Sequence, residues 1–164
     1  MVKSILLKLA LFLGCLPMMA MAMIPSKQTL VGDWLCTTDD DDYVSSALIR
    51  YRADGTASEM IEYQEKDSFY PLVELVFANY RWELKGDKLY MTDTDDLAYY
   101  ASYYNSSYDG GGMVKMSDET TQEMKLDVIN SYKENNWHYI KFHGSDKHHY
   151  YFENGFTGDC RRLK

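Results

Sequence analysis

Short runs of alternating apolar and polar residues, separated by turn residues, recur along most of the chain. The clearest run covers residues 72–85, in which Tyr80, Trp82 and Leu84 alternate with polar neighbours. Alternate side chains of a strand point to opposite faces, so this pattern predicts an antiparallel strand that buries one face. Residues 72–78 are apolar at almost every position, which leaves a short helix open as an alternative there.

Turn residues between these runs predict β-hairpins. Asp54-Gly55 is flanked by two strand-like runs, and Asp-Gly is among the strongest hairpin signals because such turns need positive φ angles. Gly86-Asp87 has the same role after the run that ends at Lys85. We therefore expect three hairpins, whose strands pair residues 45–52 with 56–66, 80–85 with 88–92, and 137–143 with 148–153.

The stretch before the last hairpin fits two interpretations. Ser117 before two acidic residues is typical of a helix N-terminus. Met124, Leu126 and Val128 also alternate as in a strand, and we favour a strand over residues 123–132. The chain then carries about eight strands, which predicts an all-β fold, a single antiparallel up-and-down β-barrel. Closure of a barrel removes the exposed sheet edges through which β-proteins aggregate.

The composition agrees with one all-β domain. The chain has 164 residues, of which 46% are apolar and 15% aromatic, enough to fill one core. Its 15 tyrosines and 10 glycines favour strands and turns over a helical bundle. The formal net charge of -8 argues against nucleic-acid binding, because phosphate contacts need a basic surface. An acidic surface is consistent with solubility or with a cationic partner.

Residues 1–22 have the pattern of a secretory signal peptide. Two lysines form a basic start, an apolar core follows, and residues 20–22 are Ala-Met-Ala, a cleavage site of the A-x-A type. We expect a mature domain of residues 23–164 that is periplasmic or secreted. Lipidation at Cys15 is the alternative, but the residues before Cys15 fit that motif poorly. No later apolar run reaches the ~20 residues of a membrane-spanning helix.

Removal of the signal peptide leaves two cysteines, Cys36 and Cys160. An even number of cysteines in an exported protein predicts a disulfide. If these cysteines face each other on antiparallel strands, Trp34 faces Arg162, because each lies two residues from its cysteine. That register places a guanidinium group over the indole ring, a cation–π contact of about 0.5–2 kcal/mol. The alternative is that the chain ends meet through a loop.

The sequence Gly32-x-Trp34, preceded by apolar residues, resembles the G-x-W motif that starts the first barrel strand in lipocalins and bacterial lipocalin-like domains. In that family an arginine near the last strand packs across the tryptophan, and Arg162, or else Arg161, matches it. The resemblance implies a lipocalin-like barrel that holds a small apolar ligand in its interior. The candidate contacts of this ligand are Tyr80, Trp82 and Tyr90. For Trp82 we favour packing in the core over ligand contact, because aromatic residues at strand spacing mostly pack.

Residues 97–108 are rich in tyrosine and precede three consecutive glycines. In a loop, exposed tyrosines offer large, rigid contact surfaces with a polar hydroxyl. In a strand or short helix they pack instead, and both alternatives stay open. The loop alternative leads to a second function, a filled barrel whose acidic, tyrosine-rich loops act as a protein–protein interaction module or inhibitor. The expected contact residues are Tyr99, Tyr100, Tyr103, Tyr104 and Tyr108.

The sequence carries no set of residues typical of an enzyme. It has no G-x-S-x-G motif, its two remaining cysteines are expected to pair, and its three glycines lack a strand–helix context for phosphate binding. Histidines at positions 138, 143, 148 and 149 surround the last hairpin without the pattern of a zinc site. Residues 39–42 are all aspartate and lack the glycine and spacing of an EF-hand. We therefore predict a non-enzymatic protein without metal or cofactor.

Overall fold

The computed structural model describes residues 25–66, 70–105 and 111–164. The predicted signal peptide, Cys15 and Tyr108 lie outside these residues. None of the helices in the described part of the chain has the length and apolar composition needed to cross a membrane.

The described residues form nine strands and two helices. The strands are β1 (Gly32–Asp39), β2 (Tyr43–Tyr51), β3 (Thr56–Glu65), β4 (Leu72–Lys85), β5 (Lys88–Asn105), β6 (Gly112–Lys115), β7 (Trp137–Phe142), β8 (Lys147–Tyr151) and β9 (Thr157–Arg162). The helices are α2 (Lys27–Leu30), before the first strand, and α3 (Asp118–Glu134), between β6 and β7.

Eight of the strands close into an antiparallel barrel, as predicted. The sheet runs in the order β4-β3-β2-β1-β9-β8-β7-β5, and β5 also pairs with β4, which joins the two ends. The three predicted hairpins correspond to the pairs β2–β3, β4–β5 and β7–β8. Among the described strands, β6 pairs with the far end of β5 alone and extends that edge outside the barrel.

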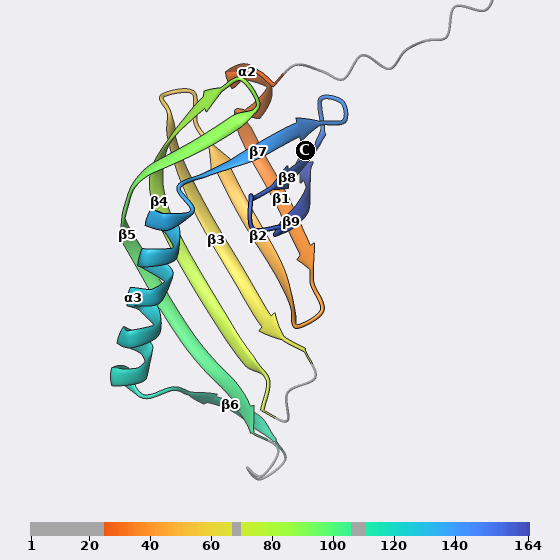
Figure 1. Cartoon of the computed structure of the whole chain (residues 1–164). Helices are drawn as coiled ribbons and strands as arrows, with labels where there is room; N and C mark the ends of the chain where they lie inside the picture. The colour runs from red at the N-terminus through yellow and green to blue at the C-terminus, as the bar shows by residue number, and fades with distance from the viewer. Residues whose placement is uncertain (1–24, 67–69, 106–110) are drawn as a thin grey trace, which may run out of the picture.

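The two walls of the barrel differ in length. Strands β4 and β5 contain 14 and 18 residues, whereas β7, β8 and β9 contain 6, 5 and 6. Strand β5 pairs with β7 over only the first residues of its length, from Lys88 to Tyr90. Figure 1 shows the short strands gathered at one end and α3 lying alongside β5. The interior of the barrel is therefore covered by strands at one end and is flanked by a helix at the other.

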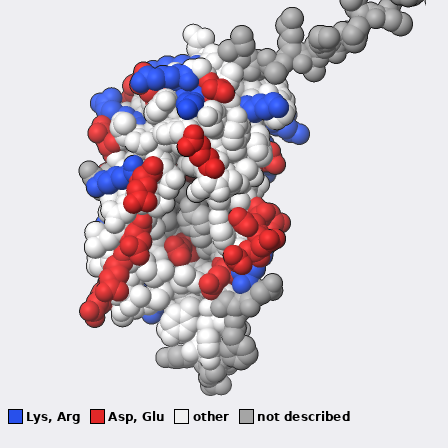
Figure 2. Space-filling view, in the orientation of Figure 1, with Lys and Arg blue, Asp and Glu red and all other residues white. Residues whose placement is uncertain are grey.

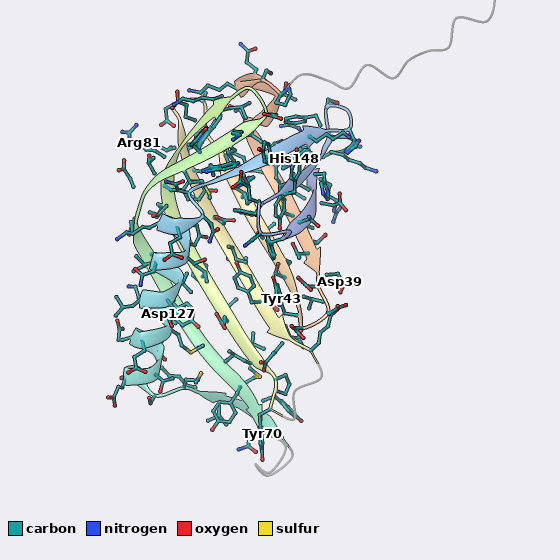
Figure 3. The ribbon with its side chains drawn as sticks, viewed as in Figure 1. Asp39, Tyr43, Tyr70, Arg81, Asp127 and His148 are labelled. Atoms are coloured by element: carbon teal, nitrogen blue, oxygen red, sulfur yellow. A yellow bond between two sulfur atoms is a disulfide. The ribbon has the colours of Figure 1, made fainter. Side chains whose placement is uncertain are left out.

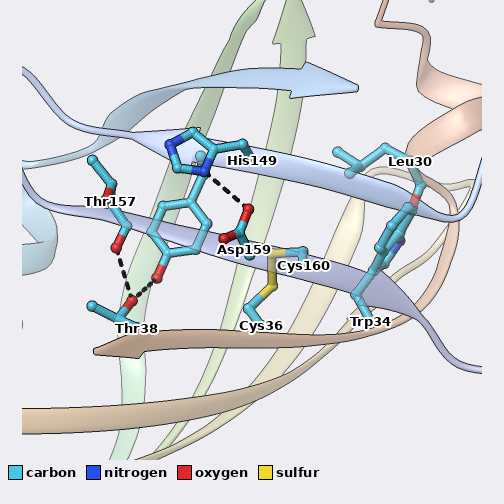
Figure 4. Close-up of a disulfide and its surroundings, with 9 residues drawn as sticks. Leu30, Trp34, Cys36, Thr38, His149, Thr157, Asp159 and Cys160 are labelled. Carbon is cyan, nitrogen blue, oxygen red and sulfur yellow. Dashed lines mark hydrogen bonds and ion pairs between the residues drawn. A yellow bond between two sulfur atoms is a disulfide. The ribbon is translucent and has the colours of Figure 1, made fainter. Parts of the chain in front are cut away.

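The first and last strands have the predicted register. Cys36 pairs with Cys160 and forms a disulfide, and Trp34 faces Arg162. Figure 4 shows the disulfide between β1 and β9, with Trp34 and Leu30 on one side of it. The guanidinium carbon of Arg162 lies 4.4 Å from the centre of the Trp34 ring. The strand interpretation of the chain ends is thus correct, and the loop alternative is excluded.

The Arg162 side chain also hydrogen-bonds to backbone carbonyl groups at this end of the barrel. It donates hydrogen bonds to the carbonyl oxygens of Val31, at 2.7 Å, Ser145, at 3.0 Å, and Thr29. Gly32 has a φ angle of +135°, and a β-carbon there collides with the Arg162 guanidinium group. The G-x-W motif therefore has a local explanation, since the glycine makes room for the arginine that covers the tryptophan.

We expect Arg162→Lys to lower the free energy of unfolding by about 2–3 kcal/mol, because lysine keeps the charge but cannot reach the three carbonyl groups at once. Urea denaturation measures this loss. Arg161→Lys is the matched control, since Arg161 is exposed on the adjacent position and its replacement leaves stability within about 0.5 kcal/mol. Equal stability of the two variants contradicts the role assigned to Arg162.

The strand favoured over residues 123–132 is wrong, because this segment belongs to helix α3. The Ser117 hydroxyl accepts a hydrogen bond from the backbone N–H of Thr120 at 3.1 Å and caps the helix, and two acidic residues occupy its first turn. Met124 and Val128 pack on the core four residues apart, as a helix requires. Leu126, which a strand would bury with them, is 60% exposed.

Two other segments, for which the sequence left a helix or a loop as an alternative, are strands. Residues 72–78 belong to β4 and not to a helix, with Val76 and Ala78 buried and Phe77 on the outer face. The tyrosine-rich segment continues β5 as far as Asn105, so its described part is a strand and not a loop. Its side chains accordingly alternate between the two faces of the barrel wall.

Candidate binding cavity

A cavity of about 320 Å³ lies inside the barrel. Its walls are inward-facing side chains of β1–β5 and β7–β9, Ser131 and Tyr132 near the end of α3, Asn135 just after it, and residues of the turn between β8 and β9. Figure 2 shows this face of the molecule hollowed at its centre, with acidic side chains on both sides of the hollow. The cavity follows from the unequal walls, because the short strands do not cover the full length of β3–β5.

One end of the cavity is closed by the core around the disulfide. His148 lies 4.5 Å from the Trp34 ring centre and 5.4 Å from that of Phe142, and both cysteines border the cavity. Figure 3 places His148 near this end of the barrel and Tyr43 toward the opposite end. Tyr43 is stacked on Phe156, at 6.2 Å between ring centres, beside the turn between β8 and β9.

Among the described residues of this lining, Glu59 is the one that carries a carboxyl group. Glu59 occupies an inward position of β3, between the buried residues Ala57 and Ile61. The hydroxyl of Tyr132 on α3 donates a hydrogen bond to Glu59 Oε2 at 3.2 Å. Tyr80 on β4 also borders the cavity, and it follows Ala78, which pairs with Glu59, by two residues, so the two side chains share a face of the sheet. Residues from two strands and the helix thus meet at one polar point within an otherwise largely apolar and aromatic space.

Burial determines the charge of the groups around the cavity. It raises the pKa of Glu59 from 4.5 to about 7, although the hydrogen bond from Tyr132 and the nearby Tyr80 hydroxyl act in the opposite direction. Burial lowers the pKa of His138 to about 4 and that of His148 to about 3, so both imidazoles are neutral at neutral pH. Among the described residues of the lining, Glu59 is then the one group that carries charge near pH 7.

The three predicted ligand contacts lie in different places. Tyr80 borders the cavity. Trp82 is buried beside it, where its indole N–H donates to the Thr56 carbonyl at 2.9 Å and its ring packs edge-on against Tyr51. Tyr90 does not reach the interior, because its neighbours on β5 face inward and it lies outside, beside Trp137. Of the three predicted contacts, Tyr80 belongs to the lining, and the carboxyl group of Glu59 was not among the residues predicted from the sequence.

The predicted partner-contact tyrosines do not form one surface. Tyr99 is buried on the inner face of β5, whereas Tyr100 and Tyr104 are exposed. Tyr103 is half-buried and packs edge-on against Tyr70, at 6.3 Å between ring centres. Tyr108 lies outside the described residues.

The described residues bring one group of potential metal ligands together, Cys36, His148 and Cys160, whose ligand atoms lie within 4.8 Å of one another. The two sulfur atoms are joined in the disulfide, and metals bind cysteine as the thiolate. His149 instead bonds to Asp159, at 3.1 Å, and His143 is exposed. Because their sulfur atoms are bonded to each other, Cys36 and Cys160 belong, with His148, to the core at the closed end of the barrel.

Comparison of the chain with models of known protein families and with curated proteins finds no match.

Proposed function

We propose that this protein is an exported, non-enzymatic binding protein that holds a small, largely apolar molecule in the barrel cavity. The observation that carries the proposal is the cavity of about 320 Å³ in a closed eight-stranded barrel. Pockets for small molecules are typically ~300–1,000 Å³ and are lined mainly by apolar and aromatic groups, with few polar ones. The lining described above has this character.

Two further features support the proposal. Arg162 packs across Trp34 as the resemblance to lipocalins implies, and lipocalin-like barrels hold small ligands in their interior. The Cys36–Cys160 disulfide suits an oxidising compartment, in agreement with the signal peptide expected in residues 1–22. The second candidate, a filled barrel with a tyrosine-rich contact loop, has less support, since the interior contains a cavity and the described tyrosines divide between two faces.

A substitution at the mouth of the cavity tests the proposal. Ser131 is exposed and borders the cavity, so Ser131→Trp places an indole ring across the opening. We expect wild-type protein to bind the neutral fluorescent probe N-phenylnaphthylamine, and Ser131→Trp to weaken this binding about tenfold or more. Fluorescence titration of the probe measures both affinities.

Asn130→Trp is the matched control, because Asn130 is exposed on the same helix but does not border the cavity. It should bind the probe as the wild type does. Native mass spectrometry of the exported protein adds a second readout, in which a small molecule that is retained in the native state and lost on unfolding supports the proposal. Absence of probe binding by the wild type, or equal binding by the two tryptophan variants, contradicts it.

A further inference from the structure

The carboxyl group of Glu59 has no function in a site whose ligand is purely apolar. It stands at a core position of β3 but keeps part of its surface open to the cavity. A carboxylate in such an environment is unfavourable unless a positive charge or several hydrogen bonds compensate for it. Tyr132 provides a hydrogen bond, and a carboxylate offers about four acceptor positions. Acceptor capacity therefore remains for a group in the cavity.

The residues around Glu59 determine which charge a ligand group in the cavity should carry. Neither lysine nor arginine occurs among the described residues of the lining, and its two histidines are neutral at neutral pH. The described part of this lining therefore offers Glu59 no cationic side chain that neutralises its charge, and offers none that attracts an anion. A ligand that brings its own positive charge supplies the missing partner, and a charge pair in a site of low dielectric constant is stronger than one in water.

Aromatic rings line the same cavity as Glu59. Five tyrosines of the lining have pKa values raised in part by the negative charge of Glu59, in addition to burial, and they come from β2, β3, β4, α3 and β8: Tyr51, Tyr63, Tyr80, Tyr132 and Tyr150. The faces of aromatic rings attract ammonium groups, and enclosure by several rings is the usual way in which proteins recognise such groups. A carboxylate among tyrosine rings is thus matched to an organic cation.

We infer that the ligand is a small organic amine, whose protonated nitrogen pairs with Glu59 among the tyrosine rings and whose apolar body occupies the rest of the cavity. This inference rests on the proposed function and specifies the chemical class of the ligand. The cavity volume of about 320 Å³ limits the amine to a small aromatic or short aliphatic body.

Isothermal titration calorimetry with three probes of similar shape tests the inference. Phenethylamine is cationic, phenethyl alcohol is neutral, and hydrocinnamate is anionic. At about pH 8, where Glu59 is mostly ionised, we expect the amine to bind about tenfold or more tightly than the alcohol, and the anion not to bind. Glu59→Gln should remove the preference for the amine and leave the affinity for the alcohol unchanged. Glu62→Gln, on the outer face of the same strand, should behave as the wild type.

The pH dependence of wild-type binding provides a test that needs no variant. Pairing with the ammonium group requires ionised Glu59, so amine affinity should fall as the pH decreases below about 7, and binding should release a proton. The other titratable groups that face Glu59 do not change charge near this pH. The five tyrosines have raised pKa values, and His138 and His148 titrate at about 4 and about 3.

The outcomes separate this inference from the proposed function. If the amine and the alcohol bind equally, or if Glu59→Gln and pH leave amine binding unchanged, the inference is overturned while the cavity remains a binding site. If neither these probes nor N-phenylnaphthylamine binds the wild type, the proposed function is overturned as well.

Discussion

Replacing both Cys36 and Cys160 with alanine is expected to lower the free energy of unfolding by about 3–5 kcal/mol. The disulfide joins residues 124 positions apart, and restriction of so long a loop in the unfolded chain gives ~5 kcal/mol in the chain-entropy model. It also connects the first and last barrel strands, which interact through a short ladder of hydrogen bonds. Urea denaturation of the double variant and the wild type measures the difference.

Alanine is the informative replacement because it leaves no thiol. A reduced protein has two thiols beside His148, and together they form a potential metal site that adds stability of its own. Wild-type protein treated with reductant and a chelator is the control, and its loss of stability should match that of the double variant. A change of less than about 1 kcal/mol in both experiments shows that β1 and β9 hold the barrel closed without the disulfide.

The closure of the barrel was predictable from the sequence because it depends on short-range geometry. Residues two apart on a strand share a face, so Trp34 and Cys36 at one end and Cys160 and Arg162 at the other define a single register. One register therefore predicted both the disulfide and the cation–π contact. The asymmetry between Arg162 and Arg161 follows from the same alternation, since only every second residue of β9 faces the interior.

The sequence left helix α3 as the less favoured alternative because Met124 and Val128 fit a period of two as well as a helical period. The residue that distinguishes the two is Leu126, and its exposure depends on packing that the sequence does not display. The tyrosines of β5 were ambiguous for a similar reason. Tyr99 and Tyr100 are adjacent and chemically identical, and only the pairing of β5 with β4 decides which of them is buried.

Glu59 was missed because acidic residues occur on both faces of β3. Glu59 and Glu62 are three residues apart and therefore point in opposite directions, and local composition does not indicate which one is inside. Glu59 pairs with Ile49 and Ala78, which are both buried, and it is therefore the glutamate that faces the interior. The cavity itself depends on the lengths of strands far apart in the sequence, which local patterns do not determine.

We expect Glu59→Gln to raise the free energy of unfolding of the ligand-free protein by about 3 kcal/mol at about pH 8. In the folded protein burial raises the pKa of Glu59 to about 7, whereas in the unfolded chain it is 4.5. The folded state therefore binds the proton more tightly, and ionisation of Glu59 destabilises it progressively as pH rises from about 4.5 through 7. One pKa unit corresponds to about 1.4 kcal/mol, which gives the expected size.

Glutamine resembles the protonated carboxyl group, so the two proteins should be equally stable below about pH 4.5 and diverge above it. The buried histidines act in the opposite direction, because their lowered pKa values make stability decrease as pH falls below 6.5. Since both proteins keep these histidines, subtracting the two stability–pH curves isolates Glu59. Urea denaturation at several pH values provides the curves. A difference that does not grow with pH means that Glu59 is compensated within the protein, and then the cavity has no unmet charge for a cationic ligand to pair with.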